Sequence, residues 1–294
     1  MGHAVGVLAM EHIAAGLVEG DRIVGPIRTY PDQADEGGSV LPTLPPAEIV
    51  QAIARLIDDA AHGYPLDVVG VGFPGVIRDG IIEDSPNLRQ MKGSALAQSL
   101  SEALSGRAHV LVLNDADAIA TGIAATRGQL DTLTRVWTLG SGVGFGRYPH
   151  APGVWEGGHV VVSLDPKESL CGCGGQGHLE GIVGHRSMRL RFLDMEPEEV
   201  FAQAAGGDAR CGAFVRLWHR AMAAAAAGSI HMDGPGRFFL SGPNARFVDT
   251  AVLAGALHDM VKMSPLQGSA FEVVARSDDL AIIGAAVGAR QSAA

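Results

Sequence analysis

Residues 46–72, PAEIVQAIARLIDDAAHGYPLDVVGVG, decide the fold class of this chain. The first part has apolar side chains at the spacing of one helical face, at Ile49, Ile53, Leu56, Ile57 and Ala60. Gly63 ends this pattern, and the apolar run LDVVGVG that follows is typical of a buried strand. A helix followed directly by a buried strand predicts an α/β protein with helices packed on a mixed sheet.

The same alternation continues on both sides of this stretch. Residues 4–25 predict a hairpin that turns at Glu19-Gly20-Asp21, and a second hairpin is expected over 75–84. Further along we expect a helix over 93–104, a strand over 109–114, a helix from Asp115, the strand-rich segment 135–148, a helix through Leu179, an Ala-rich helix over 211–230, strands over 237–241 and 271–275 with a helix between them, and a last helix over 278–289. The pattern predicts two α/β units in tandem, with a boundary near Asn114.

The composition excludes several classes of function. The chain has 294 residues and a formal net charge of −10, and it has no basic run, which argues against nucleic acid as a partner. It has no apolar run of membrane-spanning length and does not start with a secretory signal. Its three cysteines fit a reducing compartment. We therefore expect a cytoplasmic protein that binds a small molecule, and neither nucleic acid nor a membrane.

Residues 156–180, EGGHVVVSLDPKESLCGCGGQGHLE, contain a candidate metal site. His159, Cys171, Cys173 and His178 offer the imidazole and thiolate ligands that zinc prefers, and the glycines among them let the backbone fold tightly. Four protein ligands leave zinc no open position, so the predicted role of the metal is structural. The alternative is two ordinary thiols beside two unrelated histidines.

Several loops after predicted strands could face a ligand. Residues 140–146, GSGVGFG, form a turn whose amides can point at an anion, or an ordinary glycine-rich turn. Asp115 stands at the start of a helix, where an aspartate can be an N-cap or a catalytic base. The segments GFPG (72–75) and SPNL (85–88) are either turns or a wall of a ligand site.

Taken in order, GVGFPGVIRDG, SPNL, LNDADA, LGSGVG, EGGH, CGCGGQGHLE and the terminal IIGAA resemble the ROK family, named for repressors, open reading frames and kinases. Its kinases include glucokinases, fructokinases and N-acetylmannosamine kinases. The resemblance spans nearly the whole chain, although the family usually has a third cysteine where this chain has His178, a replacement that zinc tolerates. The repressor branch carries an N-terminal DNA-binding domain, which we do not expect here.

This resemblance implies a particular architecture. The expected fold is that of two-domain sugar kinases and actin-like ATPases, built from ribonuclease H-like units with a cleft between the domains. Residues 1–113 with 278–294 would form a smaller α/β domain, and residues 114–277 a larger one that carries the zinc loop. The resemblance also implies a homodimer or homotetramer.

The resemblance further implies roles for individual residues. Asp115 would be the general base that takes a proton from a sugar hydroxyl during phosphoryl transfer. The other sugar hydroxyls would be bound by Asn87, Asn114, Glu156, His159 and Glu180. The phosphates of Mg-ATP would face Gly140, Ser141, Gly142 and Gly242. His159 would use one ring nitrogen for zinc and the other for the sugar.

The first loop departs from the family pattern. ROK kinases carry DxGGT there, and in this chain Val7 takes the place of the aspartate, Ala9 and Met10 those of the glycines, and Glu11 that of the threonine. Alanine and methionine prevent the close backbone approach that glycine allows, and Glu11 adds negative charge where phosphate would sit. SGPN (241–244) also replaces a usual glycine triplet. We therefore expect Mg-ATP binding to be weak or absent.

Two functions remain open. One is a kinase of a hexose or amino sugar that tolerates the altered loop. The other is a homologue that binds a sugar or sugar phosphate and has lost ATP-dependent kinase activity, either a sensor or an enzyme of non-kinase proton-transfer chemistry.

Overall fold

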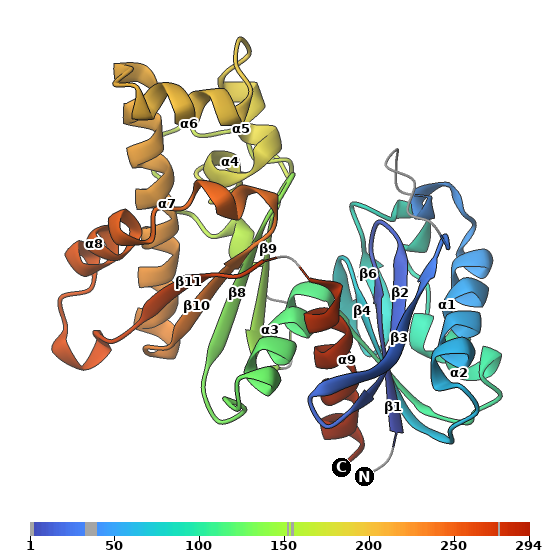
Figure 1. Cartoon of the computed structure of the whole chain (residues 1–294). Coiled ribbons are helices and arrows are strands. Elements are labelled where there is room, and N and C mark those ends of the chain that lie inside the picture. Colours follow the sequence, from blue (N-terminus) through green and yellow to red (C-terminus); the bar gives the residue numbers. More distant parts are fainter. Residues whose placement is uncertain (1–2, 33–39, 152, 154–155, 276) are drawn as a thin grey trace. The chain divides into compact units, whose positions relative to one another are not determined.

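The computed structural model describes residues 3–32, 40–151, 153, 156–275 and 277–294. The chain forms two compact units, coloured along the sequence in Figure 1. Unit 1 comprises Met1–Thr134, Gly146–Val154 and Ser277–Ala294, and unit 2 comprises Arg135–Phe145 and Trp155–Arg276. Each unit is described by itself below.

Unit 1 is built on a five-stranded sheet in the order β3-β2-β1-β4-β7. The three parallel strands are β1 (His3–Ala9), β4 (Leu66–Phe73) and β7 (His109–Asn114). The antiparallel strands β2 (Ile13–Glu19) and β3 (Arg22–Tyr30) extend the sheet beyond β1. The second predicted hairpin is β5 (Val76–Arg78) with β6 (Ile81–Asp84), which forms a sheet of its own.

Helices cover both faces of the five-stranded sheet (Figure 1). Helices α1 (Pro46–Ala61) and α2 (Leu96–Ala103) lie on one face, and α9 (Asp278–Ala293), with α3 (Asp115–Thr126) packed beside it, lies on the other. Alternate residues of β1 serve the two faces: Val5 and Val7 join the core with α1, whereas Ala4 and Leu8 join the core with α9. Short 3-10 turns at Leu41–Thr43 and Arg89–Met91 precede α1 and α2.

Glycines bring α9 unusually close to its neighbours. A Cβ atom added to Gly6 of β1 would lie 1.8 Å from the carbonyl oxygen of Ile282. A Cβ atom on Gly284 would lie 1.8 Å from the carbonyl oxygen of Ala118 in α3. The backbones of these elements are therefore in contact. This contact is why α3 belongs to unit 1, whereas the predicted domain limits put residues 114–134 in the other domain.

Unit 2 contains a four-stranded sheet in the order β11-β10-β8-β9. Its strands are β8 (Thr134–Leu139), β9 (Val143–Tyr148), β10 (Arg237–Ser241) and β11 (Ala270–Val273). The helices are α4 (Glu180–Val183), α5 (His185–Arg191), α6 (Pro197–Ala205), α7 (Ala209–Asp233) and α8 (Thr250–Met260), with 3-10 turns at Gly157–His159, Pro243–Phe247 and Ser264–Leu266. Trp137, Trp218 and Phe238 are buried at the centre of the core.

The predicted helix through Leu179 is wrong. Residues 156–179 contain one 3-10 turn and otherwise bends, turns and extended backbone, and α4 begins only at Glu180. Gly174 and Gly177 have φ values of +85° and +70°, a conformation that interrupts any helix. Among the described residues, no helix combines the length and apolar character needed to cross a membrane.

Candidate functional site

The glycine-rich turn between β8 and β9 is fixed through its carbonyl groups. The carbonyl of Gly140 accepts hydrogen bonds from the backbone N–H of His185 at 2.9 Å and from the side-chain amide of Asn244 at 3.2 Å. The carbonyl of Ser141 accepts the N–H of Arg186 at 3.2 Å. The Gly140 N–H is itself donated within the turn, to the Gly142 carbonyl at 3.0 Å, so an anion site here would use the amides of Ser141 and Gly142.

Gly242 lies against the same turn. Its φ is +93°, and a Cβ atom there would lie 2.6 Å from the carbonyl oxygen of Leu139. Both the backbone conformation and the lack of space therefore require glycine at this position. The residue that follows Pro243 is Asn244, which is fully buried and holds Gly140 as described. The four residues predicted to face phosphates, Gly140, Ser141, Gly142 and Gly242, are thus neighbours within unit 2.

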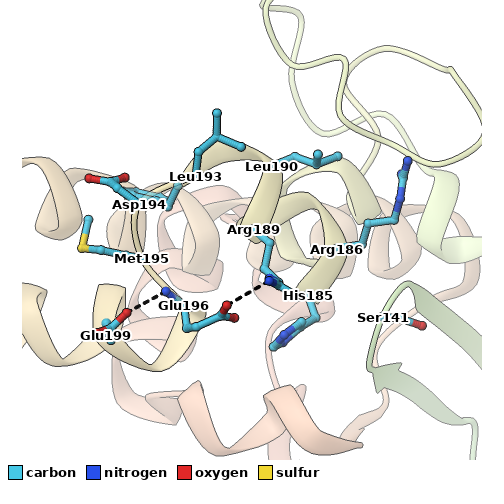
Figure 2. Close-up of a pocket in the computed structure, with 11 residues that line it drawn as sticks. Ser141, His185, Arg186, Arg189, Leu190, Leu193, Asp194, Met195, Glu196 and Glu199 are labelled. Carbon is cyan, nitrogen blue, oxygen red and sulfur yellow. Dashed lines mark hydrogen bonds and ion pairs between the residues drawn. The ribbon is translucent and has the colours of Figure 1, made fainter.

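A pocket of about 650 Å³ opens beside this turn. Ser141 lies at one end, α5 contributes His185, Arg186 and Arg189, and the segment between α5 and α6 contributes Glu196 (Figure 2). Arg189 and Glu196 form an ion pair at 3.0 Å. The sequence does not reveal this pocket, because its lining residues come together only through the packing of α5 and α6.

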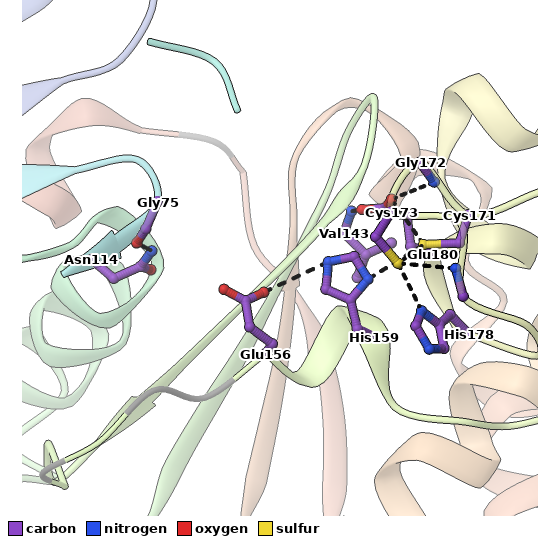
Figure 3. A network of polar contacts seen from close by, with 11 residues as sticks. Gly75, Asn114, Val143, Glu156, His159, Cys171, Gly172, Cys173, His178 and Glu180 are labelled. Carbon is purple, nitrogen blue, oxygen red and sulfur yellow. Dashed lines mark hydrogen bonds and ion pairs between the residues drawn. The ribbon is translucent and has the colours of Figure 1, made fainter. Parts of the chain in front are cut away.

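The four predicted metal ligands lie together in unit 2 (Figure 3). Their ligand atoms are all within 4.8 Å of one another. The Cys171 Sγ atom is 3.3 Å from His159 Nδ1 and 3.4 Å from Cys173 Sγ, and Cys173 Sγ is 3.2 Å from His178 Nδ1. Ligands on a tetrahedral zinc ion are about 3.3–3.8 Å apart, given the usual Zn–N and Zn–S lengths. The donor set and its spacing therefore fit zinc.

The loop that carries these ligands is anchored at several points. Glu168 is buried and forms a two-pronged ion pair with Arg191 of α5, and its carbonyl accepts the N–H of Gly177 at 2.6 Å. The Gly177 carbonyl in turn accepts the N–H of Val162 at 2.8 Å. Burial raises the pKa of the Cys171 thiol to about 12, so a bound metal must displace a proton there.

His159 presents its second ring nitrogen to an acid. Nδ1 faces Cys171, while Nε2 lies 3.8 Å from the Glu156 carboxylate (Figure 3). Glu156 is exposed and His159 is partly exposed, so both can reach a ligand in solvent. The division of His159 between zinc and sugar stays a prediction, in which Nδ1 would serve the metal and Nε2 the sugar.

Asp115 and Asn114 lie at the start of α3 in unit 1. Asn114, not Asp115, is the N-cap: its Oδ1 accepts the N–H of Ala116 at 2.8 Å, and its amide donates to the carbonyl of Gly75 at 2.9 Å. Asp115 is the first residue of the helix and only 8% exposed. The positive end of the helix dipole favours a negative charge there. Because Asn114 does the capping, the carboxylate of Asp115 does not serve as the cap.

The remaining predicted sugar contact in unit 1 is Asn87. It is exposed in the SPNL turn, which is closed by a hydrogen bond of 3.3 Å from the N–H of Leu88 to the hydroxyl of buried Ser85. The turn therefore presents the Asn87 side chain to solvent. This geometry is compatible with both predictions for SPNL, a turn and a wall of a ligand site.

A second aspartate on α3 was missed by sequence reasoning. Asp117 is buried, accepts the backbone N–H of Arg147 at 2.8 Å, and lies 3.4 Å from His150 Nδ1. The hydrogen bond with Asp117 raises the pKa of His150. The only hint in the sequence was that Asp117 follows Asp115 by two residues. These contacts lie within unit 1, between the start of α3 and residues 147–150.

Comparison with known proteins decides the family. Residues 38–291 match the ROK family. This chain belongs to the ROK family. It is 28% identical over 278 residues to a glucokinase of Pyrobaculum calidifontis, which covers 90% of this chain and 92% of that protein. It is 30% identical over 275 residues to a glucokinase of Thermotoga maritima, which covers 81% of this chain and 84% of the relative.

Solved structures confirm the fold of this ROK protein. It matches the ROK hexokinase of Thermus thermophilus with a TM-score of 0.82 and 23% identity over 99% of both chains. It matches a ROK glucokinase of Streptomyces griseus, solved with glucose and AMPPNP, with a TM-score of 0.71 and 23% identity over 99% of this chain and 100% of that one. The predicted two-domain fold of sugar kinases and actin-like ATPases is therefore correct.

The altered first loop of this ROK protein lies between β1 and β2. Met10, Glu11 and His12 form the three-residue connection, closed by a hydrogen bond of 3.0 Å from the Met10 N–H to the His12 carbonyl. His12 Nε2 lies 2.7 Å from a carboxylate oxygen of Asp278 at the start of α9. Val7 is fully buried in β1. The hairpin therefore forms without any of the glycines of DxGGT.

Proposed function

We propose that this ROK protein is a sugar kinase that transfers a phosphoryl group from Mg-ATP to a hydroxyl of a hexose or amino sugar. Asp115 would accept the proton of that hydroxyl as phosphoryl transfer proceeds. Glucose is the first substrate to test, because the relatives named above are glucokinases.

The observation that carries the sugar-binding part is the pairing of Glu156 with His159. A carboxylate and an imidazole nitrogen 3.8 Å apart offer an acceptor and a second polar group to adjacent sugar hydroxyls. Because Nδ1 of His159 faces the cysteines, a bound zinc ion would fix the ring and the direction of Nε2. Asn87, Asn114 and Glu180 would complete the set of sugar contacts.

The proposed metal is zinc, bound by His159, Cys171, Cys173 and His178. Zinc would stabilise the loop and orient His159, and all four of its positions would be filled by the protein. It would take no part in the transfer itself.

For the phosphoryl donor, the residues of this chain fit only in part. The turn of Gly140, Ser141 and Gly142 has its carbonyls engaged, and a pocket of about 650 Å³ beside Ser141 offers room for a nucleoside. The hairpin of Met10 and Glu11 lacks the glycine amides that would surround phosphates. We therefore expect weak binding of ATP, and derive no catalytic role for the hairpin.

The altered hairpin favours a second candidate function. In it, the protein binds a sugar or sugar phosphate and has no ATP-dependent kinase activity. The exposed carboxylate of Glu11 would repel the phosphates of a nucleotide, whereas the contacts proposed for the sugar are unaffected. Of the two, the kinase is preferred because full-length relatives are glucokinases.

One set of measurements separates the two functions. Calorimetry with glucose, mannose, N-acetylglucosamine and N-acetylmannosamine, each with and without AMPPNP and Mg²⁺, measures binding, and a coupled ADP-release assay measures turnover. Sugar-dependent ADP release supports the kinase. Sugar binding without ADP release or any effect of AMPPNP supports the second function, and binding of no sugar contradicts both.

The proposal also includes a homodimer or homotetramer, as the resemblance implies, and a cytoplasmic location, as the composition predicts. Sedimentation analysis of the purified protein and fractionation of the cells that produce it would test the two parts separately.

A further inference from the structure

The carboxylate of Glu180 contacts two separate loops of unit 2 (Figure 3). Its Oε2 accepts the backbone N–H of Val143, at the end of the glycine-rich turn, at 3.1 Å. Its Oε1 accepts the N–H of Gly172 at 3.3 Å and lies 3.3 Å from Cys171 Sγ, both in the metal loop. Glu180 is therefore a side chain that joins the turn to the metal loop.

The backbone on both sides leaves room for this carboxylate. A Cβ atom added to Gly142 would lie 2.4 Å from Glu180 Oε2, closer than any real contact. A Cβ atom on Gly172 would lie 3.4 Å from Oε1. By contrast, a Cβ atom on Gly140, in the same turn, would meet nothing within 4 Å. An alanine at position 142 would therefore have to displace the Glu180 carboxylate from its place beside the turn.

Glu180 adds a side-chain contact at the end of the turn, where the Gly142 carbonyl already accepts the Gly140 N–H at 3.0 Å. His185, Arg186 and Asn244 bind the carbonyls of Gly140 and Ser141, at the start of the turn. The hydrogen bond from Val143 to Glu180 fixes the end of the turn. Loss of this bond would therefore change the direction of the amides that follow Ser141.

We propose that Glu180 is a positioning residue that couples metal occupancy to the order of the glycine-rich turn. Two of the candidate ligands, Cys171 and His178, begin and end the segment that contains Gly172, and Glu180 follows two residues after His178. A bound metal holds that loop, so the Gly172 N–H stays in place to orient the carboxylate toward Val143. Without the metal, Gly172 and Glu180 both gain freedom, and the Val143 amide loses its acceptor.

This inference rests on the proposed zinc site and not on kinase activity. It adds to the sugar-binding role proposed for Glu180, since an ionised carboxylate has about four acceptor positions and could still accept a hydroxyl. The consequence is that zinc would influence the phosphate-facing turn from a distance, through one side chain, without touching a substrate.

Hydrogen–deuterium exchange of the purified full-length chain tests the coupling. The wild type is compared with and without zinc, which is removed by a chelator and then restored. We expect removal to raise exchange in the peptide that contains residues 140–143 on the order of tenfold, as for the loss of one hydrogen bond. In Glu180→Ala, exchange in that peptide should be high from the start and should no longer respond to zinc.

Three matched variants sharpen the test. Gly142→Ala should reproduce the effect of Glu180→Ala on the turn, because its methyl group displaces the carboxylate, whereas Gly140→Ala should keep the response to zinc. Glu198→Ala removes an exposed carboxylate that pairs with exposed Arg246, far in sequence from both loops, and should also keep the response to zinc. Because coupling is reciprocal, the zinc affinity of Glu180→Ala, measured by competition with a chromophoric chelator, should fall.

The inference would be overturned if zinc changed hydrogen–deuterium exchange in the metal loop of the wild type but not in residues 140–143. It would also be overturned if the chain bound no zinc. Because no sugar is present in these measurements, a protein that shows the coupling but phosphorylates no sugar contradicts only the proposed kinase function. A kinase whose turn ignores zinc contradicts only the coupling.

Discussion

His219 of α7 accepts the backbone N–H of Asp249 through its Nε2 atom, at 3.0 Å. Its Nδ1 lies 2.8 Å from the carbonyl oxygen of Val215, so Nδ1 carries the proton and both ring nitrogens of a neutral imidazole are satisfied. Asp249 is the N-cap of α8 and accepts the N–H groups of Ala251 and Val252. One buried histidine therefore joins α7 to the start of α8.

This geometry predicts a contribution to stability that depends on pH. Burial lowers the pKa of His219, so the unfolded chain takes up the proton first as the pH falls. The contribution is fully present above the unfolded pKa of 6.5 and is lost as the pH falls below it toward the lowered folded value. The free energy of unfolding, measured by denaturant titration from about pH 8 to about pH 5, should fall more steeply in the wild type than in His219→Gln. Equal slopes would show that His219 can be protonated in the folded state.

The contact of α9 with α3 predicts opposite effects at two glycines of one helix. Gly284→Ala places a methyl group 1.8 Å from the carbonyl oxygen of Ala118 and should cost about 3 kcal/mol or more, because backbone must move. Gly288→Ala meets only side chains at 3.7 Å or beyond, and should stabilise α9 by about 0.5–1 kcal/mol. Thermal unfolding of both variants measures the difference. Equal effects would mean that the close approach at Gly284 is incorrect.

More of the fold than of the candidate site could be predicted from the sequence. The alternation of β1 and the helical pattern of α1 correspond directly to their two-sided and one-sided burial. The four candidate metal ligands could be picked out because zinc chemistry restricts residue type and spacing, and the structure brings their ligand atoms within 4.8 Å of one another. The contact between Gly284 and Ala118 left no local pattern, since glycine and alanine are compatible with a helix anywhere, so the unit to which α3 belongs could not be read from the chain.

Two features of the site could not be predicted from the sequence, because neither depends on a periodic pattern. The segment 156–179 contains apolar residues, but its course is set by Gly174, Gly177 and the contacts of Glu168, not by periodic burial. The contact of Glu180 with Val143 joins residues 37 positions apart and depends on an absent side chain at Gly142. Contacts defined by the space that glycine leaves are not visible as a motif.

Asp115 can be tested without disturbing α3, because Asn114 provides the cap. Asp115→Asn should lower the rate of sugar phosphorylation by a factor on the order of 10²–10⁴, the usual contribution of a general base, and leave the sugar Kd largely unchanged. Asp117→Asn is the matched control, since its side-chain oxygen can still accept the Arg147 N–H. Steady-state kinetics with calorimetry measure both quantities. Unchanged turnover in Asp115→Asn would remove this residue from the mechanism.

The zinc loop predicts different results for its two histidines. His159→Ala should lose both zinc and sugar affinity, because its two nitrogens face the cysteines and Glu156 respectively. His178→Cys should keep zinc at one ion per chain, since a third thiolate is an equally good ligand. Metal analysis by mass spectrometry and sugar titration check both variants. If His159→Ala retains one zinc ion per chain, the ligand assignment is wrong.

The hairpin between β1 and β2 offers a gain-of-function test of the nucleotide site. Ala9 is fully buried in the core with α1 and Met10 packs against the core with α9, whereas Glu11 is exposed. Ala9→Gly and Met10→Gly therefore remove some packing, so the combination with Glu11→Thr is first checked for folding by thermal unfolding. This triple variant removes a negative charge and supplies flexible amides, and it should bind AMPPNP more tightly than the wild type in calorimetry. Val7→Asp should be added only afterwards, because Val7 is fully buried in the core beneath α1 and a carboxylate there destabilises the fold. If neither variant gains affinity while both remain folded, the loss of nucleotide binding extends beyond the hairpin, and the function that requires no ATP becomes the better account of this protein.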